Sequence, residues 1–313
     1  MIVRGRPSGL RLFLVFRGSV LKDIWPVLLV NIILATVVTM THGDLFSHKI
    51  TLTAIPFTLI GLPLAIFLGF RNNAAYDRYV EGRKLWGEIV LQNRNFARQC
   101  LTLIEHKDPL KPELGLHDVR VRMIYRTIAF SHALRHLLRG TDSTAEIKPL
   151  LTQDEWQQSS KAANIPDHLM HQMGKDLRLC LDEKRIDGCL AANIDASMSS
   201  ITAAAAACER IKSTPIPFSY TLLLHRTAYL YCFLLPFGLV DTIGFMTPFV
   251  VGLVAYTFFG LDALGDEIEE PFGNLPNDLA LDAICRGIEI NLRDTLGESH
   301  ALQPLKPVNY CLM

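Results

Sequence analysis

The apolar stretch at residues 50–70, ITLTAIPFTLIGLPLAIFLGF, most constrains what this chain can fold into, and it continues without a loop into the charged segment RNNAAYDRYVEGRKLWGE. A helix needs roughly 20 predominantly apolar residues to cross the hydrocarbon of a bilayer. This stretch supplies them without a charged side chain, and similar stretches recur at 24–40, 218–240 and 243–261. Buried core helices of a soluble protein are the alternative, but the repetition of such stretches favours a membrane protein.

The composition fits a membrane protein with a large part in water. Hydrophobic residues make up 50% of the 313 residues and charged residues 20%, with a mean hydropathy of +0.23. Lys plus Arg equal Asp plus Glu at 31 each, so no net field favours nucleic acid as a partner. The 7 cysteines are scattered and include no Cys-x-x-Cys pair, which is typical of reduced thiols facing a cytosol.

Basic residues next to the apolar stretches predict the orientation. They precede the first and third stretches and follow the second, whereas the connections at 41–49 and 241–242 hold one Lys and no Arg. Because Lys and Arg gather on the cytoplasmic side, we expect both termini in the cytoplasm and two short outer loops. No Ala-x-Ala-like site follows Met40, so we expect the first stretch to be retained. The basic residues concerned are Arg4, Arg6, Arg11, Arg17, Lys22, Arg71, Arg78, Arg83, Lys84, Arg210 and Lys212.

Residues 71–215 are predicted to form a water-facing helical body. No alternation with a period of two persists there, and no internal repeat appears. The sequence therefore predicts an all-α membrane protein with four transmembrane helices and a helical cytosolic part at about 71–215 and 262–313, built as one unit, 1–313, without separable domains. Helical spacing covers 76–106, 117–140, 168–186 and 188–211, and Pro and Gly at 108–115 interrupt it.

On a helix, the stretch at 50–70 sorts into two rows. Leu62, Ile66 and Phe70 are spaced by four residues and share one face, and the small residues Gly61, Ala65 and Gly69 form the neighbouring row. A row of small residues allows another helix to approach closely in a bilayer, and Pro63 predicts a kink. The larger row is either an ordinary lipid-facing or packing stripe, or a narrow apolar ring around a pore that gates by wetting and dewetting.

Three motifs resemble the bestrophin family, most of all its bacterial members. They are LPLAIFLGFRNNAAYDRYVEGRKLWG (62–87), TPIPFSYTLLLHR (214–226) and LGDEIEEPFG (264–273), and their order and spacing extend over most of the chain. The resemblance implies a homopentameric ion channel with one central pore, in the inner membrane of a bacterium. Its partners would be monovalent ions and the lipid bilayer.

The resemblance also implies where this pore would narrow. The family's hydrophobic neck on the second span maps onto Leu62, Ile66 and Phe70, the same residues that helical spacing groups together. A lower constriction in the cytosolic part maps onto Cys180 in DLRLCLDE, with Leu177 and Leu181 as alternatives. Val80 and Gly82 depart from the family pattern, where we expect an aromatic residue and a small helix-forming residue.

No cofactor is expected. Eukaryotic bestrophins bind calcium through an acidic run directly after Pro-Phe-Gly, but here Gly273 is followed by Asn-Leu-Pro-Asn before the first acid, Asp278. Calcium needs several oxygen ligands, mostly carboxylates, so we expect the calcium clasp to be absent. The acids before Pro271, which do not follow EF-hand spacing, are interpreted as a solvated helical face: Asp262, Asp266, Glu267, Glu269 and Glu270.

Whether the channel prefers cations or anions depends on the charges near its constrictions. Acidic rings favour cations and basic rings favour anions, and both kinds of residue flank the predicted lower constriction. The resemblance to bacterial members, which are more similar to cation pathways, whereas eukaryotic members pass chloride, implies a monovalent cation, sodium first, with a chloride channel of the same fold as the alternative. The flanking residues are Asp176, Asp182, Glu183, Lys175, Arg178 and Lys184.

A metal site or an enzyme active site has less support in the sequence. The pairs His132 with His136 and His168 with His171 have helical spacing but no nearby third zinc ligand, so no metal site is predicted. No Gly-x-Ser-x-Gly, Walker or Gly-x-Gly-x-x-Gly motif occurs, and the chain is not expected to be an enzyme. A membrane scaffold that conducts no ions remains the third reading, in which the apolar row only packs.

Overall fold

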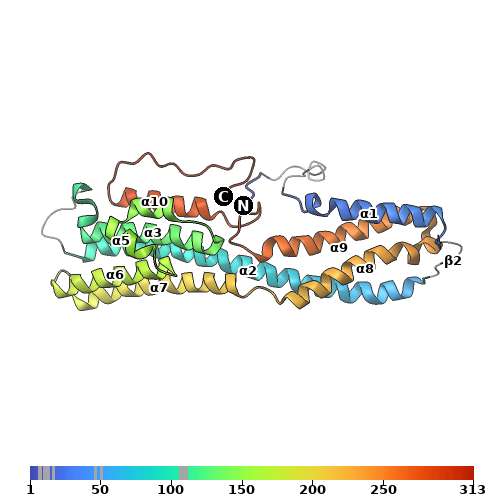
Figure 1. Cartoon of the computed structure of the whole chain (residues 1–313), viewed down its shortest axis with the longest axis horizontal. Helices are drawn as coiled ribbons and strands as arrows, with labels where there is room; N and C mark the ends of the chain where they lie inside the picture. Colours follow the sequence, from blue (N-terminus) through green and yellow to red (C-terminus); the bar gives the residue numbers. More distant parts are fainter. Residues whose placement is uncertain (6–8, 10–14, 16–17, 46–47, 50–51, 106–111) are drawn as a thin grey trace. The chain divides into compact units, whose positions relative to one another are not determined.

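The computed structural model describes residues 1–5, 9, 15, 18–45, 48–49, 52–105 and 112–313, and within them the fold is helical (Figure 1). Two short strands, β1 (Asp44–Leu45) and β2 (His48–Lys49), pair in an antiparallel hairpin. The helical fold class predicted from the sequence is confirmed. Parts of three predictions lie outside the described residues: positions 50–51 of the second span, 108–111 of the breaker, and Arg6, Arg11 and Arg17.

The chain divides into two compact units. The apolar unit comprises Arg4–Tyr79 and Pro215–Glu270, and the body unit comprises Met1–Val3, Val80–Thr214 and Pro271–Met313. One continuous helix supplies residues to both units, so the expectation of a single undivided unit stays a prediction.

Among the described residues, helices of the apolar unit lie at each of the four predicted apolar stretches. They are α1 (Leu21–Met40), the first part of α2 (Ala54–Leu103), α8 (Phe218–Ile243), the short η4 (Gly244–Met246) and α9 (Thr247–Glu269). Among the described residues, the stretches long and apolar enough to cross a membrane are α1, α2 and Phe218–Glu269, the last of which includes both α8 and α9. Gly244 separates α8 from α9 and adopts a positive φ of 51°, which favours glycine.

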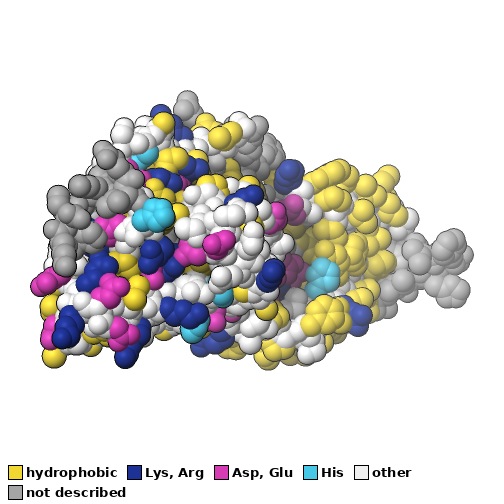
Figure 2. Space-filling model, turned by 60° about the vertical axis from the view of Figure 1, so that its left-hand side comes forward, with side chains coloured by type: hydrophobic (Ala, Val, Ile, Leu, Met, Phe, Trp, Pro, Cys, Tyr) yellow, Lys and Arg dark blue, Asp and Glu magenta, His cyan; other side chains and the backbone are white. Residues whose placement is uncertain are grey.

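Packing in the apolar unit centres on α9, which lies against α1 and α8 (Figure 1). Ile24, Cys232 and Phe259 meet in one buried cluster, and Leu64 and Leu68 of α2 meet α8 in another. Many large apolar side chains remain exposed on the outside of this unit, and Figure 2 shows them gathered as one hydrophobic surface. Such a surface is stable in lipid rather than in water.

The body unit holds the remaining helices, and its two longest after α2 were predicted closely. α3 begins after Asp118, whose side chain accepts a hydrogen bond from the Arg120 N–H, and it ends at Gly140 with a φ of 64°. The elements are the second part of α2, η2 (Pro112–His117), α3 (Val119–Arg139), α4 (Thr144–Ile147), η3 (Lys148–Leu150), α5 (Gln153–Ser159), α6 (Ile165–Asp182), α7 (Gly188–Ser213) and α10 (Leu281–Thr295).

Gly82 explains one departure from the expected family pattern. A Cβ atom at this position would lie 2.9 Å from Cε1 of Phe272, whose side chain is buried in the Pro-Phe-Gly segment. Glycine on α2 therefore makes room for that aromatic ring, which a larger residue would displace.

Both chain ends belong to the body unit and pair with each other. Ile2 forms an isolated bridge with Cys311, the Val3 N–H donates to the Tyr310 carbonyl over 2.8 Å, and the N-terminal ammonium donates to the Leu312 carbonyl over 2.6 Å. The two termini therefore lie side by side (Figure 1).

Replacing Gly82 tests the contact between α2 and Phe272. Gly82→Leu should lower the stability of the purified protein by about 1–3 kcal/mol, because overpacking displaces the buried ring. Gly87→Leu is the matched control, since nothing lies within 4 Å of a Cβ built at Gly87, and it should leave stability unchanged or raise it by up to about 1 kcal/mol. Thermal unfolding midpoints in detergent measure both, and equal midpoints would contradict the steric explanation.

Candidate functional site: the neck face of α2

The predicted neck residues lie on the surface of the protomer. Leu62, Ile66 and Phe70 are 67%, 46% and 59% exposed, whereas Leu64 and Leu68 are 3% and 0% exposed. Residues two positions apart point about 200° away from each other on a helix. The buried row of α2 therefore packs inside the apolar unit, and the row of Leu62, Ile66 and Phe70, which we call the neck face, points away from it.

The neighbouring row of small residues is used unevenly. A Cβ at Gly61 would lie 2.8 Å from the hydroxyl of Tyr231 on α8, so this glycine does allow close approach, as expected. Gly69 has nothing within 4 Å of such an atom. The α-helix continues through Pro63 without a break. Close packing of α2 against its own chain is thus confined to one end of the small-residue row.

A buried arginine ties the back of α2 to α9. Arg71 is fully buried, and its guanidinium contacts the Asp262 carboxylate at 2.9 Å, the Glu269 carboxylate at 3.5 Å and the carboxylate of Asp266. A Cβ at Gly265 would lie 3.2 Å from Arg71 Nη1, so glycine there lets the guanidinium lie against the backbone of α9. Arg71 stands about 180° around the helix from Leu62, on the face opposite the neck.

The same cluster reaches α8. His225 Nδ1 lies 2.6 Å from the second carboxylate oxygen of Asp262, and its ring stacks on Tyr229 at 4.2 Å between centroids. The interpretation of the acids before Pro271 as a solvated face is therefore wrong for Asp262, which is 3% exposed. The sequence signal was the spacing of Asp262, Asp266 and Glu269 by four and three residues, which places them on one face of α9.

Cys180, the predicted lower constriction, lies inside the protomer. Cys180 is fully buried within the body unit, and burial raises the pKa of its thiol. Leu177 is also buried, and Asp176 is held by Arg122 at 2.9 Å and by Arg126 at 2.6 Å. These side chains form the protomer core, because the apolar row of α6 packs on α3.

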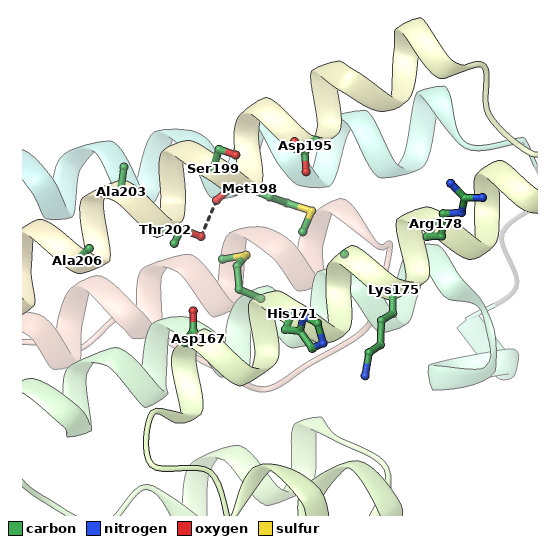
Figure 3. A pocket seen from close by; sticks show the side chains of 12 residues that line it. Asp167, His171, Lys175, Arg178, Asp195, Met198, Ser199, Thr202, Ala203 and Ala206 are labelled. Atoms are coloured by element: carbon green, nitrogen blue, oxygen red, sulfur yellow. Dashed lines mark hydrogen bonds between the residues drawn. The ribbon is translucent and has the colours of Figure 1, made fainter.

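An open groove runs between α6 and α7 (Figure 3). Met170 and Met198 contribute to its lining, and α6 places His171, Lys175 and Arg178 along one side. Asp195, Ser199 and Ala203 line it from α7. Its volume is about 730 Å³ and both charge signs are present, so the groove carries no preference for one class of ligand.

The two histidine pairs are engaged in different ways. His132 is 3% exposed, with Nδ1 2.6 Å from Glu146 and Nε2 3.4 Å from Glu289. Although burial lowers the pKa of His132, the two carboxylates raise it above its usual value, and His132 in turn lowers the pKa of Glu146. His171 lines the groove instead. Among the described residues, no group of three or more His, Cys, Asp and Glu side chains could hold a metal ion.

A family model described as "Bacterial/Fungal Bestrophin protein" matches residues 1–294. The protein named voltage-dependent anion channel-forming protein mll4386, from Mesorhizobium japonicum, is 42% identical over 303 residues, which cover 96% of this chain and 93% of that protein. The similarly named YneE of Escherichia coli K12 is 41% identical over 292 residues, or 93% of each chain.

Solved structures agree with the sequence relatives. The crystal structure of a bacterial bestrophin homologue from Klebsiella pneumoniae has a TM-score of 0.81 and 36% identity, and the match covers 87% of this chain and 98% of that one. A second crystal structure of a Klebsiella pneumoniae homologue, which carries a point mutation, has a TM-score of 0.82 and covers 90% of this chain and 100% of that one at 36% identity. The helical arrangement described above is thus shared with these structures.

Removing the buried arginine should destabilise the apolar unit. Arg71→Met leaves Asp262 buried without its cation, which typically costs about 3–5 kcal/mol. Arg226→Met is the control, because Arg226 is exposed on α8, and it should have little effect. Thermal unfolding in detergent measures both variants, and an Arg71→Met midpoint equal to wild type would show that the ion cluster does not hold α2.

The His132 cluster predicts a pH-dependent stability. A raised folded-state pKa stabilises fully below the unfolded value of about 6.5, and this contribution is lost as pH rises through the folded value. His132→Gln should therefore lower the unfolding midpoint more at about pH 6 than at about pH 9. His171→Gln, at the exposed groove, should show no such difference. A His132→Gln effect that is constant with pH would contradict the assignment.

Proposed function

The chain belongs to the bestrophin family, and from this premise we propose that it is a homopentameric ion channel with its narrowest passage at Leu62, Ile66 and Phe70. Its relatives indicate a channel rather than an enzyme. Five copies of α2 would surround one axis, each presenting its neck face. The proposed location is the bacterial inner membrane.

The exposure of the neck face carries this proposal. Its three apolar side chains are about half to two-thirds exposed in one protomer, so they are free to meet copies of themselves around an axis. A narrow ring of apolar side chains resists wetting, and small changes in its width switch conduction on and off. A ring of this kind blocks ions without any charged gate.

The proposed topology has four spans and both termini in the cytoplasm. The four apolar helices match the predicted spans, and the pairing of the chain ends within the body unit supports placing both ends on one side. The basic residues near the first and third spans favour the cytoplasm for that side.

The sign of the conducted ion has two candidates. The sequence argument favoured sodium, but that preference has no support among the relatives, whose names contain "anion channel-forming". Chloride is therefore the second candidate. Asp176 no longer bears on the choice, because it is buried and paired with Arg122 and Arg126. Of the residues predicted for a second constriction, Cys180 and Leu177 are buried, whereas Leu181 is partly exposed and stays the candidate.

Widening the neck tests the pore. In liposomes, the triple variant Leu62→Ala, Ile66→Ala and Phe70→Ala should pass ions at least about tenfold faster than wild type, because smaller side chains let the ring wet. The control replaces Leu223, Leu230 and Leu234, which are 64%, 63% and 47% exposed on α8, by alanine. These three substitutions should not change the ion flux if only α2 lines the pore.

The reversal potential under a NaCl gradient then decides the ion. A reversal near the sodium potential supports a cation channel, and one near the chloride potential supports an anion channel. Flux from neither wild type nor the triple variant would contradict the channel and leave a scaffold as the better explanation.

A further inference from the structure

The neck face continues beyond Phe70 into polar residues. Asn73 and Asp77 are both exposed on α2. Asp77 follows Phe70 by seven residues, which is two helical turns less about 20°, so the two side chains point in nearly the same direction. Asp77 stands about 10 Å further along the helix axis than Phe70.

The basic side chains in this part of α2 do not lie on the neck face. Arg71 is buried on the opposite face among the carboxylates of α9, and Arg78 Nε donates to the Glu269 carbonyl over 3.0 Å. Asp77 itself takes part in no ion pair or side-chain hydrogen bond with the described residues. On the neck face between Ala54 and Tyr79, the structure thus leaves one exposed acid and no exposed cation, and the next exposed cation in this direction is Lys84, seven residues after Asp77.

An exposed carboxylate constrains what this face can meet. A charged side chain is costly in the hydrocarbon of a bilayer and normally faces a water-filled cavity or the interface. The exposed carboxylate at position 77 therefore lies in water. Because it shares a face with the neck residues, water reaches that face two turns from Phe70, as the end of an aqueous conduit requires.

We propose that Asp77 forms a ring of carboxylates at the end of the neck and gives the channel a preference for monovalent cations. This inference rests on the proposed channel and deepens it, because the apolar neck does not discriminate between charges by itself. A ring of acids attracts cations and repels anions as they approach the constriction. Five like charges near low-dielectric walls act over about 8 Å at physiological ionic strength.

A charge series at position 77 tests the assignment. Asp77→Asn should lower the ratio of sodium to chloride permeability by about threefold or more, and Asp77→Lys should bring it below one. Asp77→Glu should keep the wild-type ratio. The effects should shrink when the salt concentration is raised, because salt screens exposed charges. Reversal potentials in planar bilayers under a NaCl gradient give the ratios.

Two controls separate a local effect from a general one. Asp23→Asn removes an exposed acid of the same unit, in the first turn of α1, and should leave the ratio unchanged. The series is repeated with the neck residues changed to alanine, where conduction no longer depends on wetting of the ring. Elution at the wild-type volume shows that each variant is assembled.

The outcomes distinguish this inference from the proposed function. If currents are normal but Asp77→Asn and Asp77→Lys leave the permeability ratio unchanged, Asp77 does not set selectivity, and the channel itself stands. A wild-type preference for chloride also overturns the assignment, because the carboxylate ring is proposed to favour cations. If neither wild type nor the neck variant conducts, the proposed channel fails and the inference fails with it.

Discussion

The ion cluster around Arg71 fixes the rotation of α2, and the candidate site depends on that rotation. A guanidinium buried in an apolar unit is tolerated only when its charge is matched and its donors are used. Asp262, Asp266 and Glu269 supply the charges from α9, and His225 extends the cluster to α8. Because the guanidinium holds the back of α2, the opposite face stays exposed among the residues that the structure describes.

This division makes α2 a helix with two unlike faces along its apolar part. One face is packed by Leu64, Leu68 and Arg71, and the other presents an apolar row that passes into Asn73 and Asp77. The same helix later supplies Trp86 and Phe96 to the core of the body unit. α2 is one helix of 50 residues. It explains why the apolar stretch at 50–70 continues into the charged segment without a loop.

The periodicity of the sequence predicted the structural features that depend on residues close together in the chain. It placed the apolar helices, the three-residue neck row and the end of α3 at Gly140, because these follow from spacing and capping. It did not predict the pairing of Arg71 with Asp262, since these residues are 191 positions apart and nothing local links them. The packing of Gly82 on Phe272 was missed for the same reason.

Other errors came from signals that were present but not used. Leu169, Met173, Leu177 and Cys180 repeat with helical spacing on α6, a pattern that indicates a buried row. Thr152 and Glu155 form a capping box at the start of α5, in a region for which no helix was predicted. The segment 262–313 was predicted to be helical, but the bounds of the amphipathic α10 (Leu281–Thr295) within it were not predicted.

The pairing of Ile2 and Val3 with Cys311 and Tyr310 joins residues that are far apart in the sequence. The body unit is likewise built from three separate segments, with the segments of the apolar unit between them. Contacts between distant residues form only after the intervening chain has been brought together, which costs loop-closure entropy. The body unit is therefore expected to fold more slowly than a helical bundle of the same size made from one continuous segment.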